Sequence, residues 1–248
     1  MARAGIGESV EGIHAVRAAL DAGRVRRLTV ERGRVEGLAD LVDEAERRGV
    51  PVEVVEDVRR SATTDAPQGV LASCDPIPLV SLEEAVAAGS PPALVVLDHV
   101  EDPRNVGAIA RTAVAAGIAS IVVPRHRAAP LGATAFKTAA GAFEALAIAE
   151  VSSIAGAVSD LKSLNVWVVA LDADGDRSLF GLELLAEPIA LVLGAEGEGV
   201  SRLARERADV IASIPLIGAM ESLNASVAAA LAMYEVARVR GWAERPKP

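Results

Sequence analysis

The chain has 248 residues, a length that suits one large domain or two smaller ones. Its 25 Lys and Arg residues are outnumbered by 34 Asp and Glu residues, so the net charge of −9 means that any nucleic-acid binding needs a local basic surface. Hydrophobic residues make up 51% of the chain, which excludes a disordered protein, and the single cysteine and three scattered histidines argue against a Cys/His zinc site.

The beginning of the chain and its apolar runs lack the features of a secretory signal or a membrane span. The opening MARAGIGESVEG carries glycines and an acidic residue where a signal peptide has an apolar core. The longest apolar run, Thr112–Pro124, is too short to cross a bilayer. We therefore expect a cytoplasmic protein that does not associate with membranes.

Residues 1–75 alternate between short helical and extended patterns. The segment GIHAVRAALDAG places Ile13, Val16 and Leu20 on one helical face and ends at Gly23. The pattern also predicts a helix over Glu36–Arg48 and strands at Leu28–Val30, Val50–Val55 and Gly69–Ser73. It therefore predicts a small α/β domain over residues 1–75.

A proline-rich stretch follows this first domain. Residues 76–92 contain a short helical pattern, SLEEAVAAG, flanked by Pro76, Pro78, Pro91 and Pro92. Proline cannot extend a helix and has no place inside a sheet, so such clusters mark boundaries. We expect residues 76–92 to be a linker to a second domain over residues 93–248.

The second domain alternates strands and helices regularly. The predicted strands are Leu94–Asp98, Ile121–Pro124, Ala145–Val151, Val166–Leu171, Ile189–Leu193 and Val210–Pro215. The predicted helices are Asn105–Ala116, Ser152–Ser163 and Ser222–Arg240, the last with Val227, Ala230, Leu231 and Tyr234 on one apolar face. Nearly continuous apolar strands separated by helices indicate a parallel sheet covered on both faces.

Basic residues gather in two parts of the chain. Residues 103–143 contain no acidic residue but five basic ones, namely Arg104, Arg111, Arg125, Arg127 and Lys137. The first domain has a smaller group around one acid, Glu31, formed by Arg24, Arg26, Arg27, Arg32 and Arg34. Local basic faces of this kind favour an anionic partner such as phosphate, although a solvated edge would explain the second group equally well. His126, between two arginines, is a further candidate for phosphate, whereas we expect His14 and His99 to be structural.

The glycine-rich run GAEGEG follows the apolar strand IALVL. Its spacing is G-x-x-G-x-G, not the G-x-G-x-x-G of a dinucleotide-binding turn, and only 49 residues follow Gly199. A plain turn is the simplest alternative, but two carboxylates inside the run need solvent or a cation. A third feature lies at the start of the last helix, where Ser222, Asn224 and Ser226 could cap the helix or help its N–H groups to bind a ligand.

Three of these segments together resemble a known family. DPRNVGAIARTAVAAG, LVLGAEGEGVSR and IPLIGAMESLNASVAAALAMYE look like the three motifs of the SpoU (TrmH) RNA ribose 2′-O-methyltransferases, in the family's order. The intervening PRHRAAPLGATAFKTAAGA resembles the subgroup that acts on guanosine in large-subunit (23S) ribosomal RNA. The EGIHAV opening is similar to the ribosomal-protein-like substrate-binding domain of that subgroup.

The resemblance implies a SPOUT-type α/β fold, with a parallel sheet and a C-terminal trefoil knot, in a homodimer whose active site is completed across the interface. It implies S-adenosyl-L-methionine as the methyl donor, with no metal. The implied donor-binding residues are Leu193, Gly194, Gly199, Ile214, Leu216, Leu223 and Ser226. The implied RNA contacts are Arg24, Arg26, Arg27, Arg125, Arg127 and Lys137.

The resemblance also assigns catalytic roles. Arg111 is implied to act at the target ribose and phosphate, and the residues that organise it and the RNA are Asn105, Glu196, Ser222 and Asn224. Glu196 is expected to pair with Arg111. Because a guanidinium normally stays charged, we leave open whether Arg111 is the base or stabilises the developing alkoxide while the proton leaves to phosphate or water.

The leading functional hypothesis is 2′-O-methylation of a guanosine ribose in 23S rRNA. Within the family, a tRNA ribose methyltransferase and a resistance-type rRNA adenosine methyltransferase are alternatives. Outside it, the chain could be a non-catalytic RNA-binding or ribosome-assembly protein, or a dehydrogenase that uses GAEGEG for a nicotinamide cofactor.

Overall fold

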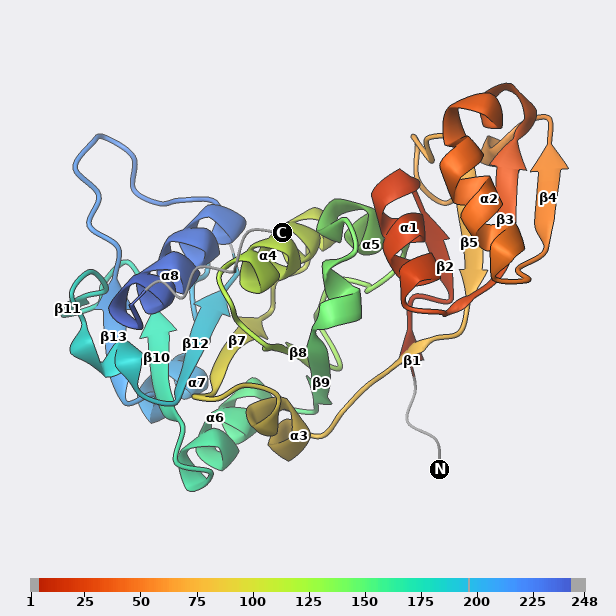
Figure 1. The fold of residues 1–248 in the computed structure, drawn as a ribbon. Helices are drawn as coiled ribbons and strands as arrows, with labels where there is room; N and C mark the ends of the chain where they lie inside the picture. Colours follow the sequence, from red (N-terminus) through yellow and green to blue (C-terminus); the bar gives the residue numbers. More distant parts are fainter. Residues whose placement is uncertain (1–4, 196, 242–248) are drawn as a thin grey trace. The chain divides into compact units, whose positions relative to one another are not determined.

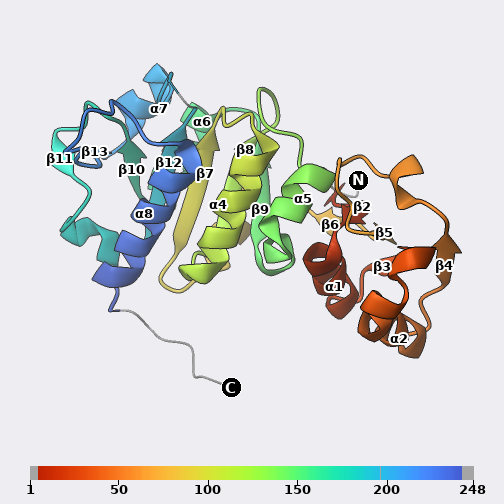
Figure 2. The ribbon, with the colours of Figure 1, turned by 90° about the horizontal axis from the view of Figure 1, so that it is seen from above.

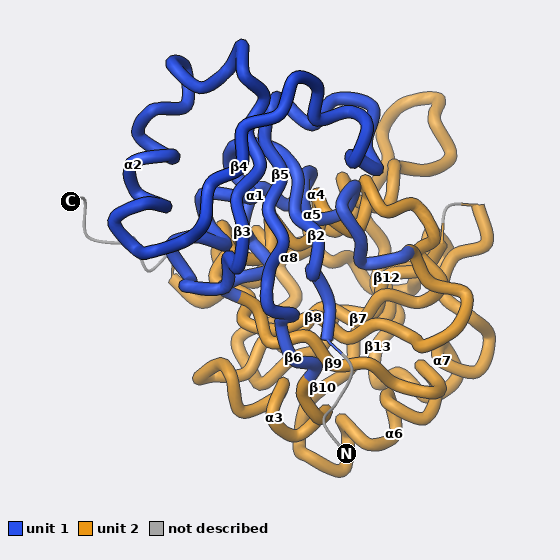
Figure 3. The backbone as a smooth tube through the Cα atoms, turned by 90° about the vertical axis from the view of Figure 1, so that its right-hand side faces the viewer, with its two compact units in different colours: residues 1–79, 130–145 blue, residues 80–129, 146–248 orange. Residues whose placement is uncertain are grey.

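The computed structural model describes residues 5–195 and 197–241. Its contacts divide the chain into two compact units, which Figure 3 colours separately. Unit 1 comprises residues 1–79 and 130–145, and unit 2 comprises residues 80–129 and 146–248. Each unit has its own sheet and core.

Unit 1 is built on a four-stranded sheet. Its strands lie in the order β2 (Ser9–Glu11), β5 (Val70–Cys74), β3 (Val25–Glu31) and β4 (Val52–Val55). Only β3 and β4 run parallel among these pairs. The predicted helices are present as α1 (Ile13–Asp21), which packs on β2 and β5, and α2 (Ala39–Arg47). A short ribbon pairs β1 (Gly5–Ile6) with β6 (Ile77–Pro78).

A segment from later in the chain completes this unit. Helix α5 (Ala133–Ala139) packs on β2 and α1, and the ring of Phe136 lies 4.7 Å from that of Phe143. Gly7 allows α5 to pack this closely, because a Cβ at Gly7 would lie 2.2 Å from the Phe136 ring. Chain order alone assigns residues 130–145 to the second domain, whereas their contacts are with unit 1.

Unit 2 contains a seven-stranded sheet (Figure 1). All six strand pairs in it are parallel, which confirms the predicted parallel sheet. The strand order is β11 (Arg177–Ser178), β13 (Val210–Ser213), β10 (Trp167–Leu171), β12 (Ile189–Gly194), β7 (Ala93–Asp98), β8 (Ser120–Pro124) and β9 (Ala147–Val151). β12 lies between β7 and β10 although it follows both in the chain.

Helices cover both faces of this sheet (Figure 2). On one face α4 (Pro103–Ala115) packs against α8 (Ala225–Val239). On the other, Leu94 and Val96 of β7 join a core with α3 (Leu82–Ala87), α6 (Ile154–Ser163) and α7 (Arg202–Arg207). The continuous apolar strands are therefore buried on both sides. Among the described residues, no helix is long and apolar enough to span a membrane.

Capping residues fix the ends of the helices nearest the strand tips. Asp102 accepts a hydrogen bond from the Arg104 N–H at the start of α4, and Pro103 occupies the first helical position. Asn224 caps α8 by accepting a hydrogen bond from the Ser226 N–H.

The expected linker is part of the fold, because Leu82 and Ala85 of its helix α3 are buried in the core of unit 2. The remaining short 3₁₀ helices are Arg32–Arg34, Glu36–Leu38, Val58–Arg60, Ala142–Ala145 and Glu183–Ala186.

Candidate functional site

The loops after β7, β10, β12 and β13 meet at one edge of the unit 2 sheet. Ligands of open parallel sheets bind outside the carboxyl ends of the strands, where such loops gather. A cavity of about 490 Å³ opens there, and we call it the donor cavity. The predicted site residues that line it are Leu193, Gly194, Gly199, Ile214, Leu216, Ser222 and Leu223. Ser226 does not line this cavity; its hydroxyl lies 2.5 Å from the Asn224 Oδ1 atom.

The glycine-rich run forms a tight turn at the wall of the donor cavity. The Gly199 N–H donates to the Ala195 carbonyl at 3.0 Å, and Gly197 and Gly199 both adopt positive φ. A Cβ on Gly194 would lie 1.9 Å from the carbonyl carbon of Gly199. Close approach of two backbone segments therefore explains Gly194, and positive φ explains Gly197 and Gly199, without a dinucleotide motif. Glu196, predicted to pair with Arg111, lies outside the described residues.

Acidic side chains dominate the charged lining of the donor cavity. Among the described residues, the carboxylates are Asp172, Asp174, Glu198 and Glu221, against one guanidinium, that of Arg205. Arg205 is paired, because its Nη1 atom lies 3.2 Å from the Asp172 carboxylate. The net negative lining suits a cationic ligand.

A second cavity of about 320 Å³ adjoins the first, and we call it the acceptor cavity. The two share Ala195, Glu198 and Ala225. Asn105 from α4 lines the acceptor cavity, and its Oδ1 atom accepts a hydrogen bond of 3.1 Å from the Asn224 side chain. Two predicted catalytic residues, 119 positions apart in the chain, are thus in contact.

Arg111 lies on α4 with an exposed side chain. It lines neither cavity, and no ion pair joins it to another residue of the described ranges. Its role at the target ribose therefore stays a prediction.

The predicted RNA contacts fall into two groups. Arg24 is used within unit 1: only 12% of its side chain is exposed, and its Nε atom donates to Glu144 at 2.8 Å. Burial opposes the charge on Arg24, but the hydrogen bond and charge of Glu144 outweigh it and raise the pKa. Three of the other predicted RNA contacts form exposed ion pairs: Arg26 with Asp75, Arg27 with Glu53, and Arg125 with Glu150. Lys137 donates a hydrogen bond to the Ala66 carbonyl, and Arg127 lines the acceptor cavity.

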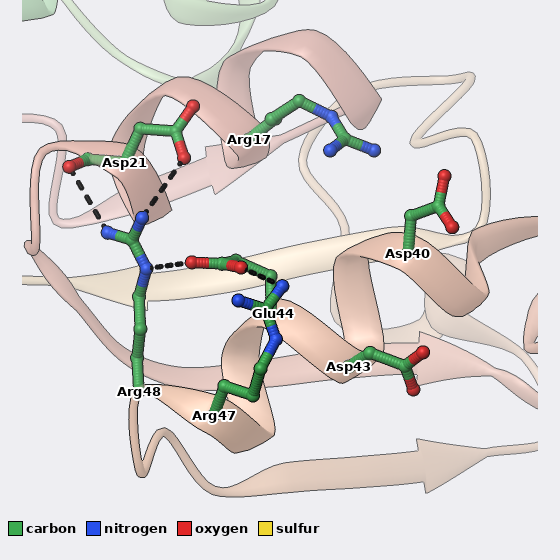
Figure 4. A pocket seen from close by; sticks show the side chains of 7 residues that line it. All are labelled: Arg17, Asp21, Asp40, Asp43, Glu44, Arg47 and Arg48. Carbon is green, nitrogen blue, oxygen red and sulfur yellow. Dashed lines mark hydrogen bonds and ion pairs between the residues drawn. The ribbon is translucent and has the colours of Figure 1, made fainter.

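In unit 1 a charged depression of about 440 Å³ lies between α1 and α2 (Figure 4). Its central groups are already paired: Glu44 contacts both Arg47 and Arg48, and Arg48 also reaches Asp21. This cleft is held together by its own ion pairs. Within the described ranges, no group of three or more His, Cys, Asp or Glu side chains could hold a metal ion.

Two polar residues at the tip of β7, beside the acceptor cavity, were not singled out as site residues from the sequence. Asp98 ends strand β7 and is completely buried, and its Oδ2 atom accepts from the Ser201 N–H at 2.7 Å. His99 follows with φ of 61° and lines the acceptor cavity. A polar pair directly after a fully apolar strand is a signal that could have found them, because parallel strands carry ligand-binding residues at their carboxyl ends.

Two family models match the chain. Residues 92–234 match the SpoU rRNA Methylase family, and residues 9–80 match a domain described as RNA 2′-O ribose methyltransferase substrate binding. Two similar relatives are named 23S rRNA (guanosine-2′-O-)-methyltransferase RlmB. The one from Photorhabdus laumondii is 38% identical and the one from Escherichia coli K12 36%; the matches cover 94% of this chain and 98% and 99% of the relatives.

Solved structures agree with this grouping. The SpoU methyltransferase AviRb from Streptomyces viridochromogenes superposes with a TM-score of 0.79 at 25% identity, over 94% of this chain and 89% of that one. Its complex with AdoMet gives a TM-score of 0.77 at 26% identity and the same coverage. An rRNA methyltransferase from Sinorhizobium meliloti with bound AdoMet gives 0.74 at 28% identity, over 93% of this chain and 86% of the other.

Proposed function

This chain belongs to the SpoU rRNA Methylase family, and from that premise we propose that it methylates the 2′-hydroxyl of a guanosine ribose in 23S rRNA. S-Adenosyl-L-methionine is the methyl donor. The observation that carries the proposal is the adjacency of two cavities with a shared wall, one lined by the predicted donor residues and the other by Asn105. A transfer between two bound molecules requires this arrangement.

The donor cavity fits the proposed donor by shape and by charge. Gly194 and Gly199 let two backbone segments close the turn at the cavity wall, and both residues line the cavity. The carboxylates of Asp174, Glu198 and Glu221 offer opposite charge to a sulfonium. When bound, the donor supplies a methyl group already activated by its positive sulfur, so the protein has mainly to position the ribose hydroxyl and help it to lose a proton.

The residues of α4 and α8 perform that positioning. The Asn105–Asn224 hydrogen bond fixes the start of α8 against α4 beside the shared wall. Ser222 lines the donor cavity just before this helix. We assign Arg111 to the target phosphate and the developing alkoxide, as a charged hydrogen-bond donor and not as the base, while the hydroxyl proton leaves to a phosphate oxygen or to water. Glu196 completes the proposed set.

A second copy of the chain covers the exposed apolar face of α8. Val227, Leu231 and Tyr234 are 46%, 37% and 42% exposed and lie at helical spacing on one face. The buried face of the same helix uses other residues, including Met233 and Val236. In the proposed homodimer, the exposed Arg111 of one subunit completes the active site of the partner subunit. Sedimentation of the purified protein tests it: a monomer at micromolar concentration would contradict this part of the proposal.

The organisation proposed along the chain has three parts. Residues 1–75 form an RNA substrate-binding domain that presents Arg26 and Arg27 and on which residues 130–145 pack. Residues 76–92 link it to the second domain and contribute α3 to the core of that domain. The rest of residues 93–248 is the methyltransferase domain. The placement of β12 between β7 and β10 supports a trefoil knot in the last part. The enzyme acts in the cytoplasm on ribosomal RNA.

The deciding experiment maps 2′-O-methylated riboses in RNA from cells with and without the gene, and then repeats the reaction with purified protein, donor and 23S rRNA. We expect one guanosine to lose its methyl group in the deletion strain and to regain it in vitro. Loss of a tRNA site or of a 23S adenosine would support one of the two related enzymes instead. Binding of RNA without binding of donor, measured by calorimetry, would indicate a non-catalytic protein.

A further inference from the structure

His99 has an unusual backbone conformation at the tip of β7. Its φ of 61° lies in the left-handed region, where residues other than glycine are uncommon and where the backbone is strained. Strand β7 is completely buried up to Asp98, so the chain turns at His99 as soon as it leaves the sheet. Strain of this kind persists only where the surrounding structure enforces it, and it is concentrated at functional sites.

The Asp98 carboxylate constrains one side of the imidazole. His99 Nδ1 lies 2.8 Å from Asp98 Oδ1, within ion-pair distance but off the direction of a good hydrogen bond. No other described group donates to this oxygen, although Asp98 is 0% exposed. A small rotation of the ring would satisfy the buried oxygen with the Nδ1–H. A carboxylate at Nδ1 fixes the tautomer in which Nε2 is a hydrogen-bond acceptor.

The rest of the ring belongs to the acceptor cavity. The His99 side chain is 27% exposed and lines this cavity with Asn105 and Arg127. Since Nδ1 faces the buried carboxylate, Nε2 is the nitrogen left for a ligand. The cavity shares Glu198 with the donor cavity, so a group bound beside His99 is close to the bound donor.

We propose that His99 binds the target nucleotide by accepting a hydrogen bond at Nε2 from its ribose hydroxyl, with Asp98 holding the ring in place. This assignment rests on the proposed function. Asp98 also accepts from the Ser201 N–H directly after the glycine turn. The same carboxylate therefore ties the ribose-binding residue to the loop that lines the donor cavity.

A pair of variants separates the imidazole from the backbone. His99→Gly removes the ring and the strain together, whereas His99→Ala removes the ring and retains the strain. If the imidazole binds RNA, both variants lower kcat/KM for 23S rRNA about tenfold, the usual cost of one hydrogen bond to substrate. Their affinity for S-adenosylmethionine, measured by calorimetry, stays within twofold of the parent.

His99→Asn is the conservative variant, because asparagine tolerates positive φ and keeps an acceptor atom. It is expected to recover part of the lost kcat/KM. His14→Ala, on the exposed surface of α1, is the matched control and retains full activity. Asp98→Asn is expected to lower kcat/KM as His99→Gly does, and the double variant is no worse than either single one.

The inference is overturned if His99→Gly matches the parent, since the residue would then serve only the turn. It is also overturned if the two single losses multiply in the double variant. Absence of methylation by the parent protein would refute the proposed function instead, so the two failures are distinguishable.

Discussion

The two units use charged residues in opposite ways. In unit 1 most of the described arginines pair with acids of the same unit: Arg48 bridges Glu44 and Asp21 on the surface, and Arg24 is buried with Glu144. In unit 2 the described carboxylates around the two cavities greatly outnumber the guanidinium groups. The buried pair of unit 1 stabilises the fold, whereas several carboxylates at the strand tips of unit 2 line cavities that can hold ligands.

The largest effect should come from Gly194→Ala in unit 2. The added methyl group would overlap the Gly199 backbone, which cannot move without opening the turn. We expect donor affinity to fall by about two orders of magnitude or more, a loss of about 3 kcal/mol in calorimetry. Gly33→Ala in unit 1 is the control, because a Cβ there meets no atom within 4 Å. Equal donor binding by the two variants would contradict this description of the turn.

Arg24→Ala tests whether charge in unit 1 is structural. It leaves the Glu144 carboxylate, 11% exposed, without its partner, and we expect a loss of about 3 kcal/mol in the free energy of unfolding. Arg26→Ala, which breaks an exposed pair with Asp75, should leave the free energy of unfolding almost unchanged. Urea unfolding of both variants measures the difference. Similar losses in the free energy of unfolding for the two variants would mean that the buried pair contributes no more to stability than the exposed pair.

Asn224→Ala compares a helix cap in the site with an ordinary one. It removes the α8 cap and the Asn105 contact, so about 1 kcal/mol of stability and about tenfold of kcat/KM should be lost. Ser153→Ala removes only the cap of α6 and should lose similar stability with unchanged kinetics. If Asn224→Ala keeps full activity, Asn224 serves only to cap α8 and has no role in catalysis.

The exposed arginines of unit 1 should have a smaller effect, on RNA binding alone. We expect Arg26→Ala/Arg27→Ala to weaken binding of 23S rRNA fragments a few-fold at low salt, because counterion release scales with the number of phosphate contacts. The slope of log affinity against log salt should decrease by about one to two. An unchanged slope, measured by filter binding, would remove these residues from the RNA surface.

The smallest expected effect concerns Asp57 in unit 1. Hydrogen bonds from the Arg59 side chain and backbone lower the pKa of Asp57 from 3.8 to about 2. Since the folded pKa is depressed, its contribution to stability is present above pH 4 and is lost as the pH falls toward 2. Acid titration of Asp57→Asn, followed by circular dichroism, should show a slightly shallower loss of stability in that window. A steeper loss would contradict the sign.

Apolar patterning predicted most strands and helices of both units, because long apolar runs in β7, β10 and β12 have few alternatives to a buried parallel strand. It could not assign residues 130–145 to unit 1, since that placement depends on contacts such as Gly7 with Phe136. The resemblance supplied the donor residues, and six of the seven line one cavity. The sequence could not show that His99 lies beside Asp98 at the acceptor cavity, or that Arg24 pairs with Glu144, because both arrangements arise from tertiary packing.

The path of the chain through unit 1 has a consequence during synthesis. Its sheet is complete once residue 79 has been made, but Phe136 of α5, which packs on Gly7, and Gly141, which packs on Ala18, emerge only with residues 130–145. Until then the ribosome holds a nascent chain whose first unit has an open apolar side. The part of the molecule proposed to recognise ribosomal RNA thus reaches its final form only after the first two strands of the other sheet have left the exit tunnel.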